Sequence, residues 1–108
     1  MTIIKSGLIQ MSLKGDTRMS PEQIRDLMLE AHLPLIDKAG EAGVQILCFQ
    51  EVFTQPYFCP SQDKKWYAAA ESIPDGPTVK LMQEYAKKYQ MVIVVPIYEE
   101  EMPGIYYN

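Results

Sequence analysis

The residue in this chain whose type and position best suit catalysis is Glu51. It comes one residue after a short, nearly continuous apolar run, residues 44–49, which contains β-branched side chains and predicts a buried strand. A carboxylate just past the carboxyl end of such a strand lies where α/β sheets place reactive groups. Apolar neighbours would help it hold a proton near neutral pH, so Glu51 is a candidate general acid/base. The alternative is that Glu51 simply begins a solvated loop, since strands often end in a charged residue.

The loop after Glu51 carries three aromatic residues, Phe53, Tyr57 and Phe58. We expect them to form the wall of a substrate-binding pocket. Ordinary core packing stays an equal alternative for Phe53. Tyr57 has a hydroxyl group that could reach a substrate or its leaving group, which favours a pocket position.

The other reactive side chains fit a catalytic role less well. Cys59 follows Glu51 by eight residues, with Lys64–Lys65 as conceivable partners, but nothing places Cys59 on a rigid element. A structural or pocket-lining role is therefore favoured for Cys59. Cys48 is expected in the core, and His32 at the surface or its boundary. With one histidine and no CxxC pair, the sequence lacks metal-ligand spacing, and we expect neither a metal nor another cofactor.

Strands and helices alternate along the chain. The predicted order is strand, helix, strand, helix, strand, strand, over residues 2–11, 20–40, 44–49, 75–89, 91–98 and 105–108. A further short helix is expected over 61–71, and the acidic run 99–101 is expected to be a solvated turn. This order predicts an α/β layered fold with helices on one face of the sheet.

The first predicted helix has clear local signals. Ser20 and Gln23 have the spacing of a capping box, and Pro21 suits the first helical position. Pro34 removes a hydrogen bond to the carbonyl of Glu30 and crowds it. The sequence therefore predicts a kink at Pro34, or two helices that meet there.

Composition excludes several classes of protein. The net charge of −4 argues against a nucleic-acid-binding or anionic-membrane surface, and the longest apolar runs are too short to span a bilayer. The N-terminus, MTIIKSGLIQ, lacks the features of a signal peptide, so a cytoplasmic location is expected. The 108 residues suit one small domain. Because the chain stops as a strand begins, that domain is expected to be incomplete at its C-terminus.

Four segments in order resemble the nitrilase superfamily of carbon–nitrogen hydrolases. VQILCFQEVFTQPYFC is similar to the family's segment in which a strand ends in an aromatic residue, one further residue and the catalytic Glu. Many members have Pro at the intervening position, and Gln50 here looks most like the branch of β-ureidopropionase and N-carbamoylputrescine amidohydrolase. The other three segments are IKSGLIQMS, IPDGPTVKLMQEYAKKYQMVIVVPIYE and the terminal Tyr107-Asn108.

The resemblance implies an α-β-β-α sandwich of which residues 1–108 form the N-terminal portion. It implies a Glu-Lys-Cys triad that hydrolyses an amide or N-carbamoyl compound through a thioester, with Glu51 as the acid/base. The matching lysine and cysteine would follow Asn108, so the 108 residues alone should be inactive. The resemblance also implies a small-molecule amide or ureido substrate and a homodimer or larger homo-oligomer.

Two other functions stay open from the sequence. The chain could be a non-catalytic α/β module for assembly or binding, which would require that no Lys and Cys follow in the gene. It could also belong to an acyltransferase of the same superfamily, in which an amine or alcohol accepts the acyl group instead of water.

Overall fold

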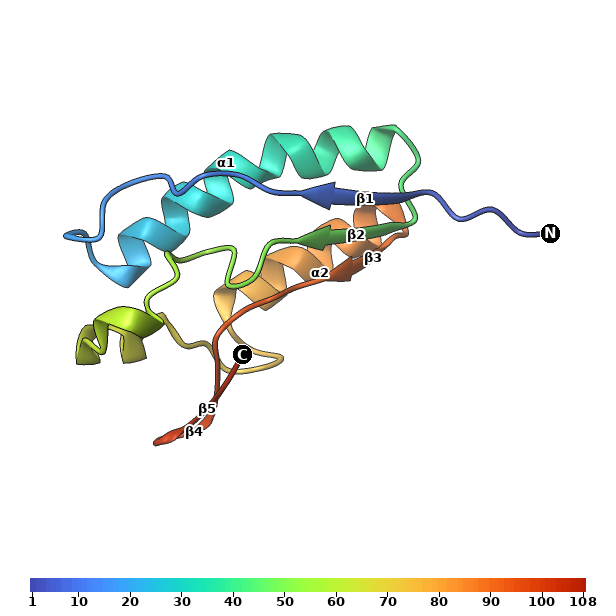
Figure 1. Ribbon diagram of the computed structural model, residues 1–108. Helices are drawn as coiled ribbons and strands as arrows, with labels where there is room; N and C mark the ends of the chain where they lie inside the picture. The colour runs from blue at the N-terminus through green and yellow to red at the C-terminus, as the bar shows by residue number, and fades with distance from the viewer.

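The computed structural model describes residues 1–108, and a small parallel sheet lies at its centre (Figure 1). The helices and strands in chain order are β1 Ser6–Ile9, α1 Pro21–Glu41, β2 Ile46–Phe49, α2 Pro77–Tyr89, β3 Val92–Val94, β4 Glu99–Met102 and β5 Ile105–Tyr107. The parallel sheet has the order β1-β2-β3, and β4 and β5 form a separate antiparallel hairpin. This arrangement confirms the predicted α/β fold class.

The register of the parallel strands separates the sheet into two faces. Gly7, Leu47 and Ile93 lie side by side in one row, and Leu8, Cys48 and Val94 lie side by side in the next. Successive side chains along a strand point to opposite faces, so the two rows face opposite sides. The first row belongs to the face that α1 and α2 cover. The hydrophobic core there comprises Ile9, Leu29, Ile36, Leu47, Phe49, Phe53, Met82, Met91 and Ile97.

No element of the chain covers the other face of the sheet. Leu8 is 83% exposed, and Val92 and Val94 are also exposed. The strand predicted over 91–98 is thus not buried as expected. It is also shorter than predicted, at Val92–Val94. Its VIVV pattern suits burial on both faces, but only the row that contains Ile93 packs against a helix.

Helix α1 begins as the sequence predicts. The Ser20 hydroxyl oxygen accepts the Gln23 backbone N–H at 3.2 Å, and the Gln23 side-chain oxygen accepts the Ser20 backbone N–H at 3.0 Å. This confirms the capping box. Pro34 lies inside one continuous helix that runs to Glu41, so two helices do not meet there. The loss of one backbone hydrogen bond is tolerated because α1 is packed on both sides of Pro34, by Met28 against Trp66 and by Ile36 in the core with the sheet.

The two helices touch at a glycine. A Cβ atom added to Gly40 would overlap the ring of Tyr89, so only glycine lets this ring pack on α1. The Asp37 carboxylate accepts hydrogen bonds from the Tyr89 hydroxyl and from the Lys88 ammonium group. These two donors, the hydroxyl first, hold the pKa of Asp37 below its ordinary value.

The segment between β2 and α2 differs from the prediction. Residues 61–71 form no α-helix, and two short 3₁₀ turns, η1 Cys59–Ser61 and η2 Lys64–Ala69, take its place. The Asp63 carboxylate accepts the Lys65 backbone N–H at 2.9 Å and so begins the second turn. Aspartate side chains such as that of Asp63 favour turns and caps over helix interiors, so a 3₁₀ turn begins here and the predicted α-helix does not run through Asp63.

Glu71 connects this segment to both α2 and the hairpin. It is 8% exposed, and its carboxylate accepts the backbone N–H of Thr78 at 2.7 Å and the Thr78 hydroxyl. Its backbone N–H donates to the carbonyl of Tyr98, and its own carbonyl accepts the backbone N–H of Glu100 at 3.0 Å. The acidic run 99–101 is therefore part of strand β4 and not a solvated turn, because Glu71 and strand β5 supply backbone partners for it.

Candidate active site

Glu51 is the second residue after β2, and its side chain is exposed. The next residue, Val52, has a φ of 47° and is 5% exposed. A positive φ is a genuine outlier for a β-branched residue. This turn sends the side chains of Val52 and Phe53 into the interior while the Glu51 carboxylate stays at the surface. Backbone strain of this kind persists where the surrounding structure enforces it, and it clusters at functional sites.

A hollow of about 490 Å³ lies beside Glu51. Its lining residues come from the ends of β1 and β2 and from the loop after β2, and they are Gln10, Met11, Leu13, Gln50, Glu51, Gln55, Pro56 and Tyr57. The Gln50 side-chain oxygen accepts the backbone N–H of Met11 at 2.6 Å, which joins the carboxyl ends of the two strands. Gln55 donates to the carbonyl of Pro21 at 2.9 Å and ties the loop to the start of α1. The hollow therefore has a floor held by hydrogen bonds between separate elements.

One side chain hydrogen-bonds to the Glu51 carboxylate. The amide nitrogen Nδ2 of Asn108 donates to Oε1 of Glu51 at 2.5 Å. Asn108 follows strand β5, and Figure 1 shows this end of the chain returning from the hairpin toward the body of the molecule. From the sequence, Asn108 could be placed only at the opening of a strand, since no local pattern indicates a contact between residues this far apart in the chain.

The three aromatic residues of the loop lie in different places. Tyr57 is 68% exposed and lines the hollow beside Glu51. Phe53 is fully buried, and its ring stacks on Phe49 with centroids 4.5 Å apart. Phe53 is thus a core residue, because the turn at Val52 directs it inward, and it does not line the hollow. Phe58 stacks on Trp66 and lines a second hollow.

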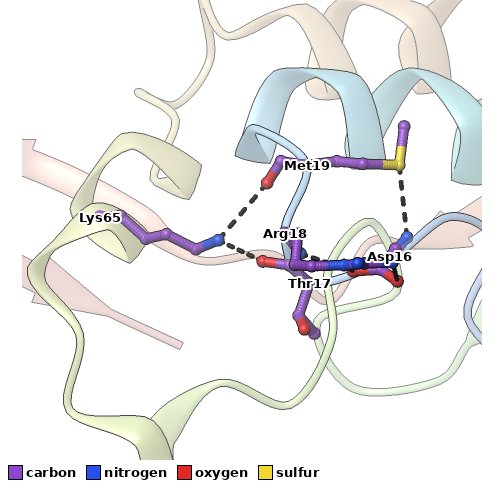
Figure 2. Close-up of polar contacts among 5 residues, drawn as sticks. All are labelled: Asp16, Thr17, Arg18, Met19 and Lys65. Atoms are coloured by element: carbon purple, nitrogen blue, oxygen red, sulfur yellow. Dashed lines mark hydrogen bonds and ion pairs between the residues drawn. The ribbon is translucent and has the colours of Figure 1, made fainter.

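This second hollow, of about 250 Å³, contains the other residues considered for chemistry. Cys59 and Lys64 line it together with the ring of Trp66. The ammonium group of Lys65 donates to the carbonyls of Thr17 and Met19, in the loop before α1 (Figure 2). Neither cysteine and no lysine is among the residues that line the hollow at Glu51.

Figure 2 also shows how the loop before α1 is held. The Asp16 carboxylate accepts two hydrogen bonds from the Arg18 guanidinium group, at 2.9 and 2.8 Å. These bonds hold the pKa of Asp16 below its ordinary value. Lys65 therefore joins an ordered loop to the 3₁₀ segment, which is a structural role.

His32 is fully buried and not at the surface. Its Nδ1–H donates to the carbonyl of Met28 at 2.7 Å, and its ring meets Phe49 and Phe53 edge-on. Burial lowers the pKa of His32 below its ordinary value, and the bond to Met28 partly opposes this. The sequence pattern could not reveal this position, because a polar residue is not counted in a hydrophobic stripe.

Clusters of three or more His, Cys, Asp or Glu side chains that could hold a metal ion do not occur in the structure. None of the helices combines the length and the apolar character needed to cross a membrane.

The chain belongs to the carbon–nitrogen hydrolase family, whose family model matches residues 8–108. It is 42% identical to a β-ureidopropionase of Arabidopsis thaliana over 101 residues, which are 93% of this chain and 24% of that protein. An N-carbamoylputrescine amidase of Solanum lycopersicum is 36% identical over 66 residues, 61% of this chain and 22% of that protein. These similarities confirm the resemblance stated from the sequence.

A solved structure has the same fold. The crystal structure of a carbon–nitrogen hydrolase from Helicobacter pylori G27 superposes with a TM-score of 0.64 at 25% identity. The superposition covers 97% of this chain and 33% of that one. The chain therefore spans about a quarter of the length of the β-ureidopropionase and a third of the length of the solved hydrolase.

Proposed function

We propose that the whole protein hydrolyses a carbon–nitrogen bond in an amide or N-carbamoyl compound, with Glu51 as its general acid/base. The observation that carries this proposal is the position of Glu51, exposed beside a hollow at the end of β2 and followed by a strained turn. The family of the chain supplies the class of reaction.

The proposed reaction needs two further groups, a lysine and a cysteine supplied by a segment outside these residues. Glu51 takes the proton of the cysteine thiol as the sulfur attacks the amide or carbamoyl carbon. It then gives this proton to the departing amine or ammonia. The lysine stabilises the oxyanion of the tetrahedral intermediate. Glu51 next takes a proton from water as the water oxygen attacks the thioester carbon. It returns this proton to the departing cysteine sulfur, so the acyl group leaves as a carboxylic acid and the thiol is restored.

We propose an N-carbamoyl compound as the more favoured substrate. Two of the relatives are named for such substrates, a β-ureidopropionase and an N-carbamoylputrescine amidase. The side-chain amide of Gln10 and the amide nitrogen of Gln50 line the hollow and offer donors and an acceptor to a planar ureido group. Tyr57 would contribute its hydroxyl group at the rim of the same hollow.

The test is Glu51→Gln in the whole protein, assayed with N-carbamoyl-β-alanine, N-carbamoylputrescine and a simple amide. Glutamine keeps the size of the side chain but cannot transfer the proton, so kcat should fall by about 10²- to 10⁴-fold. Glu84→Gln is the matched control, because Glu84 is an exposed carboxylate on α2. Unchanged turnover in the folded Glu51→Gln protein would remove Glu51 from the mechanism.

Tyr57 has a test of its own. Tyr57→Phe should change the activity or the preference among the three substrates, while the melting temperature stays close to that of the unmodified protein, because the side chain is 68% exposed. A marked fall in melting temperature with unchanged kinetics would make Tyr57 a packing residue.

A further inference from the structure

The hydrogen bond between Asn108 and Glu51 has a specific chemical consequence. An amide nitrogen only donates, so Oε1 of Glu51 must keep a lone pair directed at Nδ2 of Asn108 while this bond exists. The other oxygen, Oε2, accepts no hydrogen bond within this chain, so both of its lone pairs stay open to a proton.

We propose that Asn108 is a positioning residue that fixes the rotation of the Glu51 carboxylate and reserves Oε2 for proton transfer. The proposal rests on the proposed function, because it assigns Asn108 a task in the chemistry of Glu51. Without this bond an exposed glutamate samples several rotamers, and each rotamer points its oxygens differently. A general base is effective only within hydrogen-bond reach of the proton that it takes, so a fixed rotation raises the rate.

The hairpin that carries Asn108 is itself anchored to the body of the molecule. The backbone N–H of Glu71 donates to the carbonyl of Tyr98 at 2.9 Å, at the entrance to β4. On β5, the ring of Tyr106 stacks on Tyr67 and on Tyr98, with centroids 5.0 and 5.4 Å away. These contacts hold both strands of the hairpin, so the residue after β5 is delivered to a defined place beside Glu51.

Few charges compete with this contact. Among the residues that line the hollow, Tyr57 is the only titratable group besides Glu51. None of the ion pairs in the structure includes Glu51, since they join Arg18 to Asp16, Arg25 to Asp26, and Lys88 to Asp37. Within this chain, Asn108 is therefore the group that orients the carboxylate.

The test compares Asn108→Leu and Asn108→Asp in the whole protein. Leucine has a similar shape and no donor, so kcat should fall by about 10- to 100-fold, as expected for one hydrogen bond to a charged group, with KM nearly unchanged. Aspartate places a second negative charge beside Glu51, so its loss in kcat should be larger. Tyr107→Phe, at an exposed neighbour, is the control.

The outcomes separate this inference from the proposed function. An active unmodified protein whose Asn108→Leu variant keeps its kcat would overturn the positioning role. An Asn108→Leu variant that differs from the unmodified protein only in a lower melting temperature would overturn it as well. Should Asn108→Leu fail to fold, the polar Asn108→Asp variant carries the comparison.

If the unmodified protein hydrolyses none of the three substrates, the proposed function fails but the contact can still be measured. Side-chain scalar couplings of Glu51, measured by NMR, should report one rotamer in the unmodified protein and an average over several rotamers in the Asn108→Leu variant. Identical couplings in the two proteins would show that Asn108 does not act on Glu51.

Discussion

Removal of the Glu71 carboxylate should release the start of α2. Helix α2 begins after Gly76, which has no side chain to cap it, and the carboxylate of Glu71 serves as the cap instead. It accepts both the backbone N–H and the hydroxyl of Thr78, a fully buried residue. A Cβ on Gly76 would come within 2.8 Å of Glu71, so the absence of a side chain at Gly76 allows this approach.

The size of the effect follows from these bonds. Each hydrogen bond to a charged group contributes about 1.5–3 kcal/mol, and truncation leaves the Thr78 donors buried without a partner. Glu71→Ala should therefore lower the free energy of unfolding by about 3–5 kcal/mol. Glu71→Gln keeps an acceptor for the N–H and loses mainly the charge at the helix N-terminus, which should cost about 1 kcal/mol.

The measurement is urea unfolding of the whole protein together with hydrogen exchange in the first turn of α2. Glu84→Ala, an exposed carboxylate on the same helix, serves as the control and should stay within about 0.5 kcal/mol of the unmodified protein. A double-mutant cycle with Thr78→Val should give a coupling energy of about 1–2 kcal/mol. If Glu71→Ala behaves like Glu84→Ala, or the coupling is near zero, the cap does not hold α2.

Two further predictions concern the packing of α1. Gly40→Ala should lower the free energy of unfolding by about 1–3 kcal/mol, although alanine favours helices, because its Cβ would overlap the Tyr89 ring. The loss should disappear in a Tyr89→Ala background, and a loss that persists there would exclude the ring as its cause. Burial lowers the pKa of His32 below 6.5, so the unfolded chain binds a proton that the folded protein does not. The free energy of unfolding should therefore be highest above pH 6.5 and should fall as the pH drops below 6.5, by at most about 1.4 kcal/mol per pH unit. A His32→Phe variant that keeps the same dependence on pH would show that His32 is not its cause.

Local signals in the sequence predicted the elements whose causes are local. The capping box of Ser20 and Gln23 and the start of α2 at Pro77 lie where the sequence indicates, because their partners are a few residues away. The acidic run 99–101 could not be predicted as a strand in this way. Its partner Glu71 lies far back in the chain, and pairing overrides the low strand propensity of glutamate.

The site was predictable to a similar extent. The apolar run before Glu51 predicts a strand end, and this alone places the carboxylate at the edge of the sheet. The left-handed conformation of Val52 cannot be read from the residue type, since β-branched residues avoid it. Consequently the sequence favoured a pocket position for Tyr57, which lies at the rim of the hollow, but left pocket and core open for Phe53, which lies in the core.

The contact between Glu51 and Asn108 has a consequence for biosynthesis. The two residues are 57 positions apart, and translation adds about 5–20 residues per second. Glu51 therefore leaves the ribosome several seconds before Asn108 can reach it. Until β3 has been made, the edge of β2 that later pairs with it has no partner. The Glu51 carboxylate receives its hydrogen bond only after the hairpin docks, which makes this contact a late event in the folding of this segment.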